Sequence, residues 1–180
     1  TGSEFAGAGS QILLADGGSI SGGAVTIAAG GNLSVAGAPA SALVDMQIVN
    51  NGAVDIGTAG QGATLEIGGT VYLLQTGAVN LSDNAGTAIV SNGATAELIN
   101  GHNTISGAGT IGDANLTVVN RSSAVIEATG VNPLTLTGAG VGNTGLIEAV
   151  GSGGLIVSGT TLSNMTTIDP NTPGGEVAES

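Results

Sequence analysis

The chain repeats one short segment along most of its length. Residues 143–149 read NTGLIEA: an amide residue, small residues, an apolar residue, then a polar or acidic one, usually followed by a second apolar one. The other copies are NNGAVDI at 50–56, QTGAVNL at 75–81, SNGATAEL at 91–98, NRSSAVIEA at 120–128 and NMTTIDP at 164–170. A unit this short cannot bury its apolar side alone, so the copies must stack on one another.

The spacing of the copies predicts a parallel β-solenoid. The last two intervals, from Asn120 to Asn143 and from Asn143 to Asn164, are nearly equal, while the earlier intervals are less even. The run LTL at 134–136 also recurs as LIV at 155–157, at the same offset as Asn143 and Asn164. A period near 21 with two or three short strands per period predicts coils whose strands pair with the coil below, at ~4.8 Å. The solenoid is clearest from Asn50 onward.

The right-handed sense of the coil is predicted because the sequence lacks the six-residue repeat of left-handed solenoids. A left-handed hexapeptide solenoid would show an aliphatic residue at every sixth position, and no such register is present. The sequence therefore predicts an all-β, right-handed parallel β-helix with coils of about 21 residues. A β-sandwich or jelly roll is the structural alternative.

Composition supports strands over helix or disorder. The chain is 41% hydrophobic and only 8% charged, with 34 glycines and 1% aromatic residues. Disorder requires low hydrophobicity and high charge, and neither is found. Glycine or a turn residue interrupts almost every window of ten, so no apolar stripe of helical spacing survives.

The chain is long enough for one domain. Residues 1–5, TGSEF, are interpreted as a vector-derived scar because Gly-Ser and Glu-Phe are encoded by common cloning sites. Residues 6–168 are predicted to form a single β-solenoid domain, and residues 169–180 a carboxy-terminal linker or tail.

Charge excludes two classes of partner. The chain carries 13 acidic residues against one cation, Arg121, for a formal net charge of −12. Binding to nucleic acid, or to an anionic membrane surface, depends on cationic side chains.

No apolar run reaches the ~18 residues that span a bilayer, so membrane insertion of this segment is not expected. Cysteine is absent, which excludes disulfides and thiolate metal sites.

The acidic position of the repeat is predicted to point outward, because it lies between two inward apolar residues. Stacked coils would align these side chains as a ladder: Asp55, Asn80, Glu97, Glu127, Glu148 and Asp169. The favoured interpretation is a solvated surface that blunts lateral aggregation. Collection of calcium or of a cationic partner is the alternative, although one carboxylate per coil supplies few of the six to eight oxygens that calcium prefers.

The amide position that opens the repeat predicts a second ladder. It holds Asn50, Gln75, Asn92, Asn143 and Asn164, with Asn120 shifted by two residues. Amide side chains can hydrogen-bond the backbone of a turn and stack on copies of themselves. We expect them to satisfy polar groups at one corner of the coil.

No residue presents a catalytic, cofactor or metal signature. The acids outside the ladder show no recognised spacing: Asp16, Glu66, Asp83 and Asp113. His102 is a lone histidine in a polar turn, expected to be exposed, and Tyr72 is the only Phe, Tyr or Trp side chain outside residues 1–5. We therefore predict a protein that is not an enzyme and binds no cofactor. Asp83 and Asp113 would favour a glycosidase if both lay in one groove.

The carboxy-terminal repeats resemble a known family. GAGTIGDANLTVVNRSSAVIEA at 107–128, followed by residues 134–169, resembles the passenger and haemagglutinin-type coils of bacterial type V secreted surface proteins, in which N-x-G-x-I-x-A recurs once per coil. The resemblance covers residues 50 to 170. It implies a right-handed β-helix that is exported across the outer membrane and serves as a stalk or adhesive surface.

The function expected on these grounds is a non-enzymatic structural or adhesive segment of a large bacterial extracellular protein, an adhesin or autotransporter passenger. The resemblance implies a secreted or cell-surface location and a role in virulence. Expected partners are a host or bacterial surface, the extracellular matrix, or further copies of the chain. Two alternatives are a polysaccharide-binding or polysaccharide-degrading β-helix and a capsid or phage tail-fibre solenoid.

Overall fold

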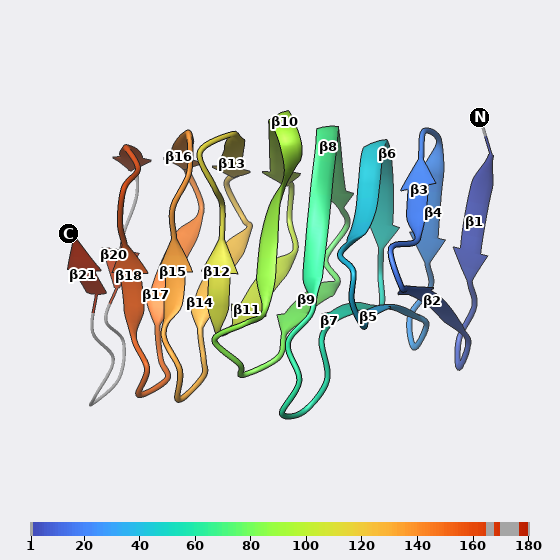
Figure 1. The fold of residues 1–180 in the computed structure, drawn as a ribbon, viewed down its shortest axis with the longest axis horizontal. Helices are drawn as coiled ribbons and strands as arrows, with labels where there is room; N and C mark the ends of the chain where they lie inside the picture. Colours follow the sequence, from blue (N-terminus) through green and yellow to red (C-terminus); the bar gives the residue numbers. More distant parts are fainter. Residues whose placement is uncertain (1, 165–167, 170–176, 180) are drawn as a thin grey trace.

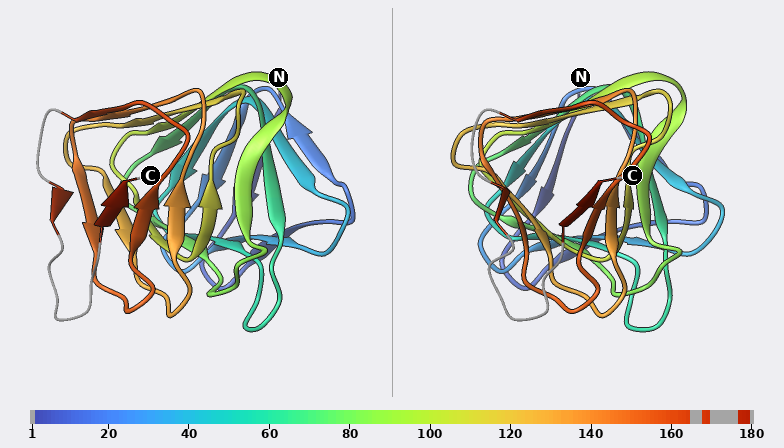
Figure 2. Two further views of the ribbon diagram at one scale, coloured as in Figure 1. Left: turned by 60° about the vertical axis from the view of Figure 1, so that its left-hand side comes forward. Right: turned by 90° about the vertical axis from the view of Figure 1, so that its left-hand side faces the viewer.

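The computed structural model describes residues 2–164, 168–169 and 177–179, and in these residues the chain is a parallel β-solenoid without helices (Figure 1). Each coil has three faces, and the view along the axis shows a roughly triangular outline (Figure 2). The predicted all-β parallel β-helix is confirmed. Its right-handed sense stays a prediction.

Faces 1 and 2 belong to one sheet of 13 strands that bends at a corner. Face 1 stacks β3 (Ser19–Ser21), the first halves of β6 (Ser41–Asn50), β8 (Thr64–Leu74) and β10 (Ala88–Asn100), then β12 (Gly109–Ile111), β15 (Leu134–Leu136), β18 (Leu155–Val157) and β21 (Val177–Glu179). Face 2 stacks β1 (Ser3–Ala6), β4 (Ala24–Ile27), the second halves of β6, β8 and β10, then β13 (Leu116–Asn120), β16 (Gly140–Asn143) and β19 (Leu162–Asn164).

Face 3 is a separate sheet of eight strands. It stacks β2 (Gln11–Ala15), β5 (Asn32–Ala36), β7 (Ala53–Ile56), β9 (Ala78–Leu81), β11 (Thr104–Gly107), β14 (Val125–Ala128), β17 (Leu146–Ala149) and β20 (Ile168–Asp169). Eight strands in one stack correspond to seven coil intervals. Every pairing between these strands is parallel.

Coil length varies along the chain, as the unequal early intervals of the repeat indicate. Asn143 and Asn164, which are partners in register on face 2, lie 21 residues apart, as predicted. Asp55 and Asn80, partners on face 3, lie 25 residues apart. The extra residues of the longer coils leave as the turns at 57–63 and 82–87 and as a bulge at 92–95 in β10. The core register is therefore kept while the perimeter varies.

The core is a set of aligned aliphatic columns. Residues in the strands alternate between buried and partly exposed, as the pleat of a strand requires. One column on face 3 holds, in consecutive register, Leu33, Val54, Val79, Ile105, Ile126 and Ile147, none more than 2% exposed. Each such side chain is covered by its equivalents above and below, which explains why the repeat must recur.

Strand pairing extends beyond the predicted solenoid limits. Ser3–Ala6 pairs with Ala24–Ile27, so β1 includes three of the five residues interpreted as a cloning scar. At the other end, β20 includes Asp169, and β21, within the predicted tail, pairs with β18. The coils before Asn50, where the repeat is weakest, are complete.

Candidate functional site

A chain of asparagines runs up the corner between faces 2 and 3, and all of them except the last, Asn164, are buried. Asn100 donates from Nδ2 to Oδ1 of Asn120 (3.0 Å), Asn120 to Asn143 (2.8 Å), and Asn143 to Asn164 (2.8 Å). Asn100 and Asn120 are fully buried. Each amide points its donor toward the carboxy-terminal coil, so the dipoles align along the axis and reinforce one another.

The same amides close the turns that follow them. The Oδ1 atoms of Asn50 and Asn143 accept the backbone N–H two residues ahead, from Gly52 and Gly145, both at 3.1 Å. Asn120 Nδ2 also reaches the carbonyl oxygen of Leu146 in the next coil (3.0 Å). The predicted corner role of the amide position is thus confirmed for Asn50, Asn120 and Asn143.

Two members of the predicted amide ladder were wrong. Gln75 is exposed, with a left-handed φ of 67°, and Asn92 lies exposed in the bulge of β10. Their places are taken by Asn103, which accepts from Asn50 Nδ2 at 2.9 Å, and by Asn100. Aligning the copies on the strand that follows the amide, rather than on the Asn-Gly pair, would have found Asn100.

The apparent shift of Asn120 has a simple cause. Asn120 pairs directly with Asn143, so it occupies the ladder position without displacement. Five positions separate Asn120 from Val125, but three separate Asn143 from Leu146, and Val125 pairs with Leu146. The two additional residues lengthen the corner turn only.

The outward acidic row is confirmed on face 3 for Asp55, Asn80, Glu127 and Glu148, whereas the side chain of Asp169 lies outside the described residues. Consecutive register places Asp55 opposite Asn80, Glu127 opposite Glu148, and Glu148 opposite Asp169. Glu97 does not belong to this row: it lies on face 2 between Thr70 and Thr117. The Asn-Gly pair before it forms the bulge between faces 1 and 2, so the strand that follows is a face 2 strand. Ser106 fills the row instead, between Asn80 and Glu127.

The carboxylates of this row differ in their surroundings. Asp55 accepts hydrogen bonds from the side-chain amides of Asn32 and Asn80, the latter at 2.7 Å. Two neutral donors thus satisfy both of its oxygens. Burial, and then the charge of Glu148, raise the pKa of Glu127 above its ordinary value. Among the described residues no group of three His, Cys, Asp or Glu side chains is placed to hold a metal ion.

Asp83 connects two coils that are not adjacent. Its carboxylate accepts the backbone N–H groups of Val131 and Asn132 and the side-chain amide of Asn132, each at 3.0 Å. The backbone N–H of Asn132, followed by that of Val131 and the Asn132 amide, lowers the pKa of Asp83. In the intermediate coil only Ala108 separates β11 from β12, so no loop lies between Asp83 and its partner Val131, 48 residues further along the chain.

Asp113 plays a similar part at another corner. It accepts from Ser91 N (2.9 Å) and Ser91 Oγ (2.8 Å) in the previous coil, and from the N–H groups of Asn115 and Leu116 in its own turn. Burial acts to raise the pKa of Asp113, but the hydrogen bonds from Asn115, Ser91 and Leu116 outweigh it, and the pKa is lowered. Ser91 itself is buried.

The structure does not bring the candidate catalytic acids together. Asp83 lies in the turn from face 3 to face 1, after β9, whereas Asp113 lies in the turn from face 1 to face 2, after β12. Both carboxylates are occupied by hydrogen bonds that join turns. Asp16 follows β2, and Glu66 lies on face 1 in β8. His102 is exposed in a corner turn, as predicted.

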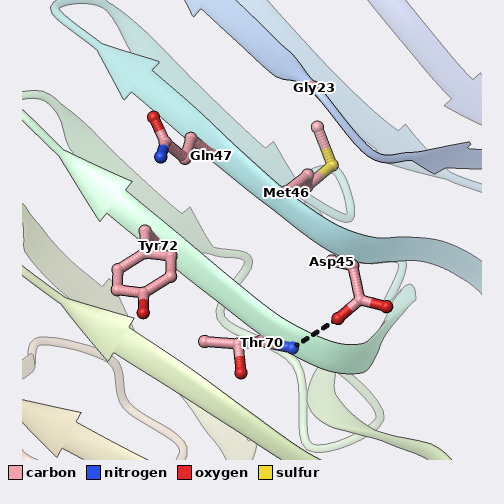
Figure 3. Close-up of a pocket in the computed structure, with 6 residues that line it drawn as sticks. All are labelled: Gly23, Asp45, Met46, Gln47, Thr70 and Tyr72. Carbon is pink, nitrogen blue, oxygen red and sulfur yellow. Dashed lines mark hydrogen bonds between the residues drawn. The ribbon is translucent and has the colours of Figure 1, made fainter. Parts of the chain in front are cut away.

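Among the shallow hollows of the described surface, one of about 410 Å³ is lined by Gly138, Ala139, Gly159, Thr160 and Thr161 alone, and two others contain carboxylates. The larger, about 720 Å³, lies on face 3 beside the turns at 57–62 and 82–83, and both of its carboxylates, Asp55 and Asp83, are already hydrogen-bonded within the protein. The smaller, about 370 Å³, lies on face 2 and is lined by Gly23, Asp45, Met46, Gln47, Thr70 and Tyr72 (Figure 3).

The hollow on face 2 was not found from the sequence. Tyr72 pairs in register with Gln47 of the preceding coil. Gln47 pairs in turn with Ala24, one coil earlier, and Gly23 lies next to Ala24 in the sequence. The hollow forms because Ala24 and Gly23 have almost no side chain. A signal was present in the sequence: Tyr72 is the only Phe, Tyr or Trp side chain after Phe5, and it lies at an outward position between the apolar residues Val71 and Leu73.

The described residues include no helix long and apolar enough to cross a membrane. Comparison of the chain with protein-family models, with curated proteins and with solved structures found no match.

Proposed function

We propose that the chain is a non-enzymatic structural and adhesive segment of a large bacterial extracellular surface protein, of the adhesin or autotransporter-passenger type. The observation that carries this proposal is that buried and turn polar side chains form hydrogen bonds within the protein. The buried asparagines, Asp83 and Asp113 all bond one coil to another or close a turn. The two acids that share a hollow in the described surface, Asp55 and Asp83, both hold hydrogen bonds within the protein.

A stack of this kind suits a stalk. Its strands pair with the next coil along the whole described length, and its outward positions on face 3 are mostly polar or acidic. Paired backbone and few long loops limit the sites at which a protease can act. The proposed location is the bacterial cell surface or the medium, and the proposed partners are a host or bacterial surface, the extracellular matrix, or other copies.

The chain's charge limits how it would adhere. With a single cation, Arg121, it has little to offer an anionic surface such as a nucleic acid or an acidic lipid. Adhesion would instead use neutral hydrogen-bonding groups or turns on the perimeter.

The test uses inert beads coated with the chain. We expect them to be retained on immobilised extracellular matrix or cells, or to cluster with one another, more than beads coated with an unrelated acidic protein. The folded chain should also resist proteinase K at neutral pH. Rapid digestion together with neither retention nor clustering would contradict the proposal.

A parallel assay addresses the enzymatic alternative. The chain is incubated with neutral and acidic polysaccharides, and newly formed reducing ends are measured. We expect none. Reducing ends that appear with the chain and disappear in Asp83→Asn or Asp113→Asn, with the fold intact by circular dichroism, would favour a polysaccharide-degrading enzyme.

A further inference from the structure

The hollow on face 2 differs from the corner asparagines and the turn carboxylates because most of its side chains do not hold the coils together. Gln47 is exposed, and Tyr72 and Thr70 are partly exposed. The described structure shows no hydrogen bond from the Tyr72 hydroxyl, the Thr70 hydroxyl or the Gln47 amide. These groups are therefore available to a ligand.

Asp45 is held in a fixed orientation beside them. Its backbone has a left-handed φ of 48°, and its Oδ1 accepts the backbone N–H of Thr70 at 3.1 Å (Figure 3). Gly69, with a φ of 57°, makes room for the carboxylate, since a Cβ there would overlap with Oδ1. Only one oxygen is engaged, so Oδ2 remains as a charged acceptor that is already positioned.

Tyr72 supplies the apolar part of the hollow. It is the only aromatic side chain on the coils after β1, and the register places it between Gln47 and Ile99. Ile99 is only 5% exposed, although it occupies an outward position. An aromatic ring with an aliphatic neighbour on one side and hydrogen-bonding groups on the other is the arrangement that stacks on the C–H face of a sugar ring.

We propose that this hollow binds a neutral pyranose of a surface or matrix polysaccharide. Tyr72 stacks on the sugar ring, Asp45 Oδ2 accepts from a sugar hydroxyl, and Gln47 and Thr70 complete the hydrogen bonds. Uronic acids and sulfated sugars are excluded by Asp45 and by Glu97, which is next to Thr70 in register, because no cation lines the hollow. The open, shallow shape suits one unit of a long chain.

The larger hollow on face 3 does not meet the same conditions. It has no aromatic side chain, and its two carboxylates accept hydrogen bonds from Asn32, Asn80, Val131 and Asn132. A ligand there would have to displace bonds that join coils. The inference therefore concerns face 2 alone.

The test is a titration of the ¹⁵N-labelled chain followed by NMR, with methyl glucoside, methyl galactoside, methyl mannoside and N-acetylglucosamine as neutral probes. Glucuronate is the anionic probe and tetramethylammonium the cationic one. We expect at least one neutral sugar to shift the amide signals of residues 45–47 and 70–72 in a saturable manner, and glucuronate to bind more weakly than that sugar.

Three variants and a matched control identify the groups involved. Tyr72→Leu removes the ring but keeps an apolar side chain, and Asp45→Asn keeps the acceptor for Thr70 and tolerates the left-handed backbone. Each should weaken binding about fivefold. Gln47→Ala should also weaken it, whereas Gln11→Ala, an exposed glutamine on face 3, should not.

The inference is overturned if no neutral sugar shifts these signals in a folded chain, if the shifts lie elsewhere, or if Tyr72→Leu binds as well as the parent. Tighter binding of tetramethylammonium than of any sugar would also overturn it. The biological sense of the site rests on the proposed surface role, but the two fail separately: beads retained without sugar binding would leave the adhesive proposal standing, and sugar binding without retention would leave only the site.

Discussion

Asn50 donates a hydrogen bond from Nδ2 to Oδ1 of Asn103, a residue 53 positions further along the chain, and both side chains are completely buried. Asn103 can occupy this position because the side chain of Gln75 is exposed and does not fill the corner. The Nδ2 of Asn103 donates to the carbonyl oxygen of Gln75 at 3.1 Å. Its backbone N–H in turn donates to Asn100 Oδ1 at 3.0 Å. One asparagine thereby bridges a coil that has lost its own corner amide and keeps the ladder continuous.

Replacement of Asn50 should be costly, and replacement of its neighbour Asn51 should not. Asn50→Ala removes the bonds to Gly52, Ala78 and Asn103 and leaves buried groups without partners. We expect a loss of about 3 kcal/mol in the free energy of unfolding, measured by urea denaturation. Asn51 is exposed, so Asn51→Ala should change it by less than ~0.5 kcal/mol. Similar losses in the two variants would contradict a stabilising ladder.

The reach of Asp83 across a coil depends on the absence of a side chain at residue 130. A Cβ at Gly130 would lie 2.5 Å from Asp83 Oδ1 and 2.8 Å from the Cβ of Ala108. Gly130→Ala should therefore lower the thermal unfolding midpoint by several degrees, of the order of 2 kcal/mol. Gly140→Ala is the control, because nothing lies within 4 Å of its added Cβ. A Gly130→Ala midpoint equal to that of Gly140→Ala would show that Asp83 does not join these coils.

The fold could be predicted from sequence because residues at equivalent positions of successive repeats stack on one another as the apolar columns of the core. Ile126 and Ile147 occupy the same place in successive copies of the repeat and are adjacent in the core. The exceptions arose where an amide-Gly pair occurs at a different corner. Asn92-Gly93 looks like the start of the repeat but forms a bulge, and so Glu97 was assigned to the wrong face. A local motif encodes a turn, but only the register of neighbouring coils tells which turn it is.

Side-chain contacts between residues of different coils could not be predicted from the sequence. Nothing near Asp83 indicates that its partners are Val131 and Asn132, because the bond depends on the tight turn of the coil between them. The hollow at Tyr72 likewise depends on Gly23 and Ala24, which lie two coils earlier. The length of a turn decides the first and the small size of two residues decides the second, and the repeat specifies neither.

Asp83 should stabilise the protein at neutral pH and lose that effect in acid. Its pKa in the folded chain lies below the ordinary value of 3.8, because backbone N–H groups bond to the charged form. Its contribution is therefore complete above pH 3.8 and is lost as the pH falls through the folded pKa. Asp83→Asn should lower the unfolding midpoint at pH 7, and the difference should shrink in more acidic buffer. A constant difference at every pH would refute this linkage.

Glu127 should act in the opposite direction. Its pKa is raised above the ordinary value of 4.5, so the charged form carries a cost that is present above the folded pKa and disappears below 4.5. Glu127→Gln should raise stability at pH 7 by ~0.5 kcal/mol, and less at high salt. Glu97→Gln is the matched control, because its register neighbours are Thr70 and Thr117. Equal gains in both variants would argue against repulsion between Glu127 and Glu148.

The chain is a stack of parallel coils, and long-range NMR contacts test this arrangement most directly. Parallel stacking predicts backbone contacts at one constant difference in residue number: Ile126 with Ile147, Thr135 with Ile156, and Val141 with Leu162. A β-sandwich built from hairpins would instead give contacts between residues whose numbers add to a constant. Contacts of the first kind support the coil, and contacts of the second kind at these positions would contradict it.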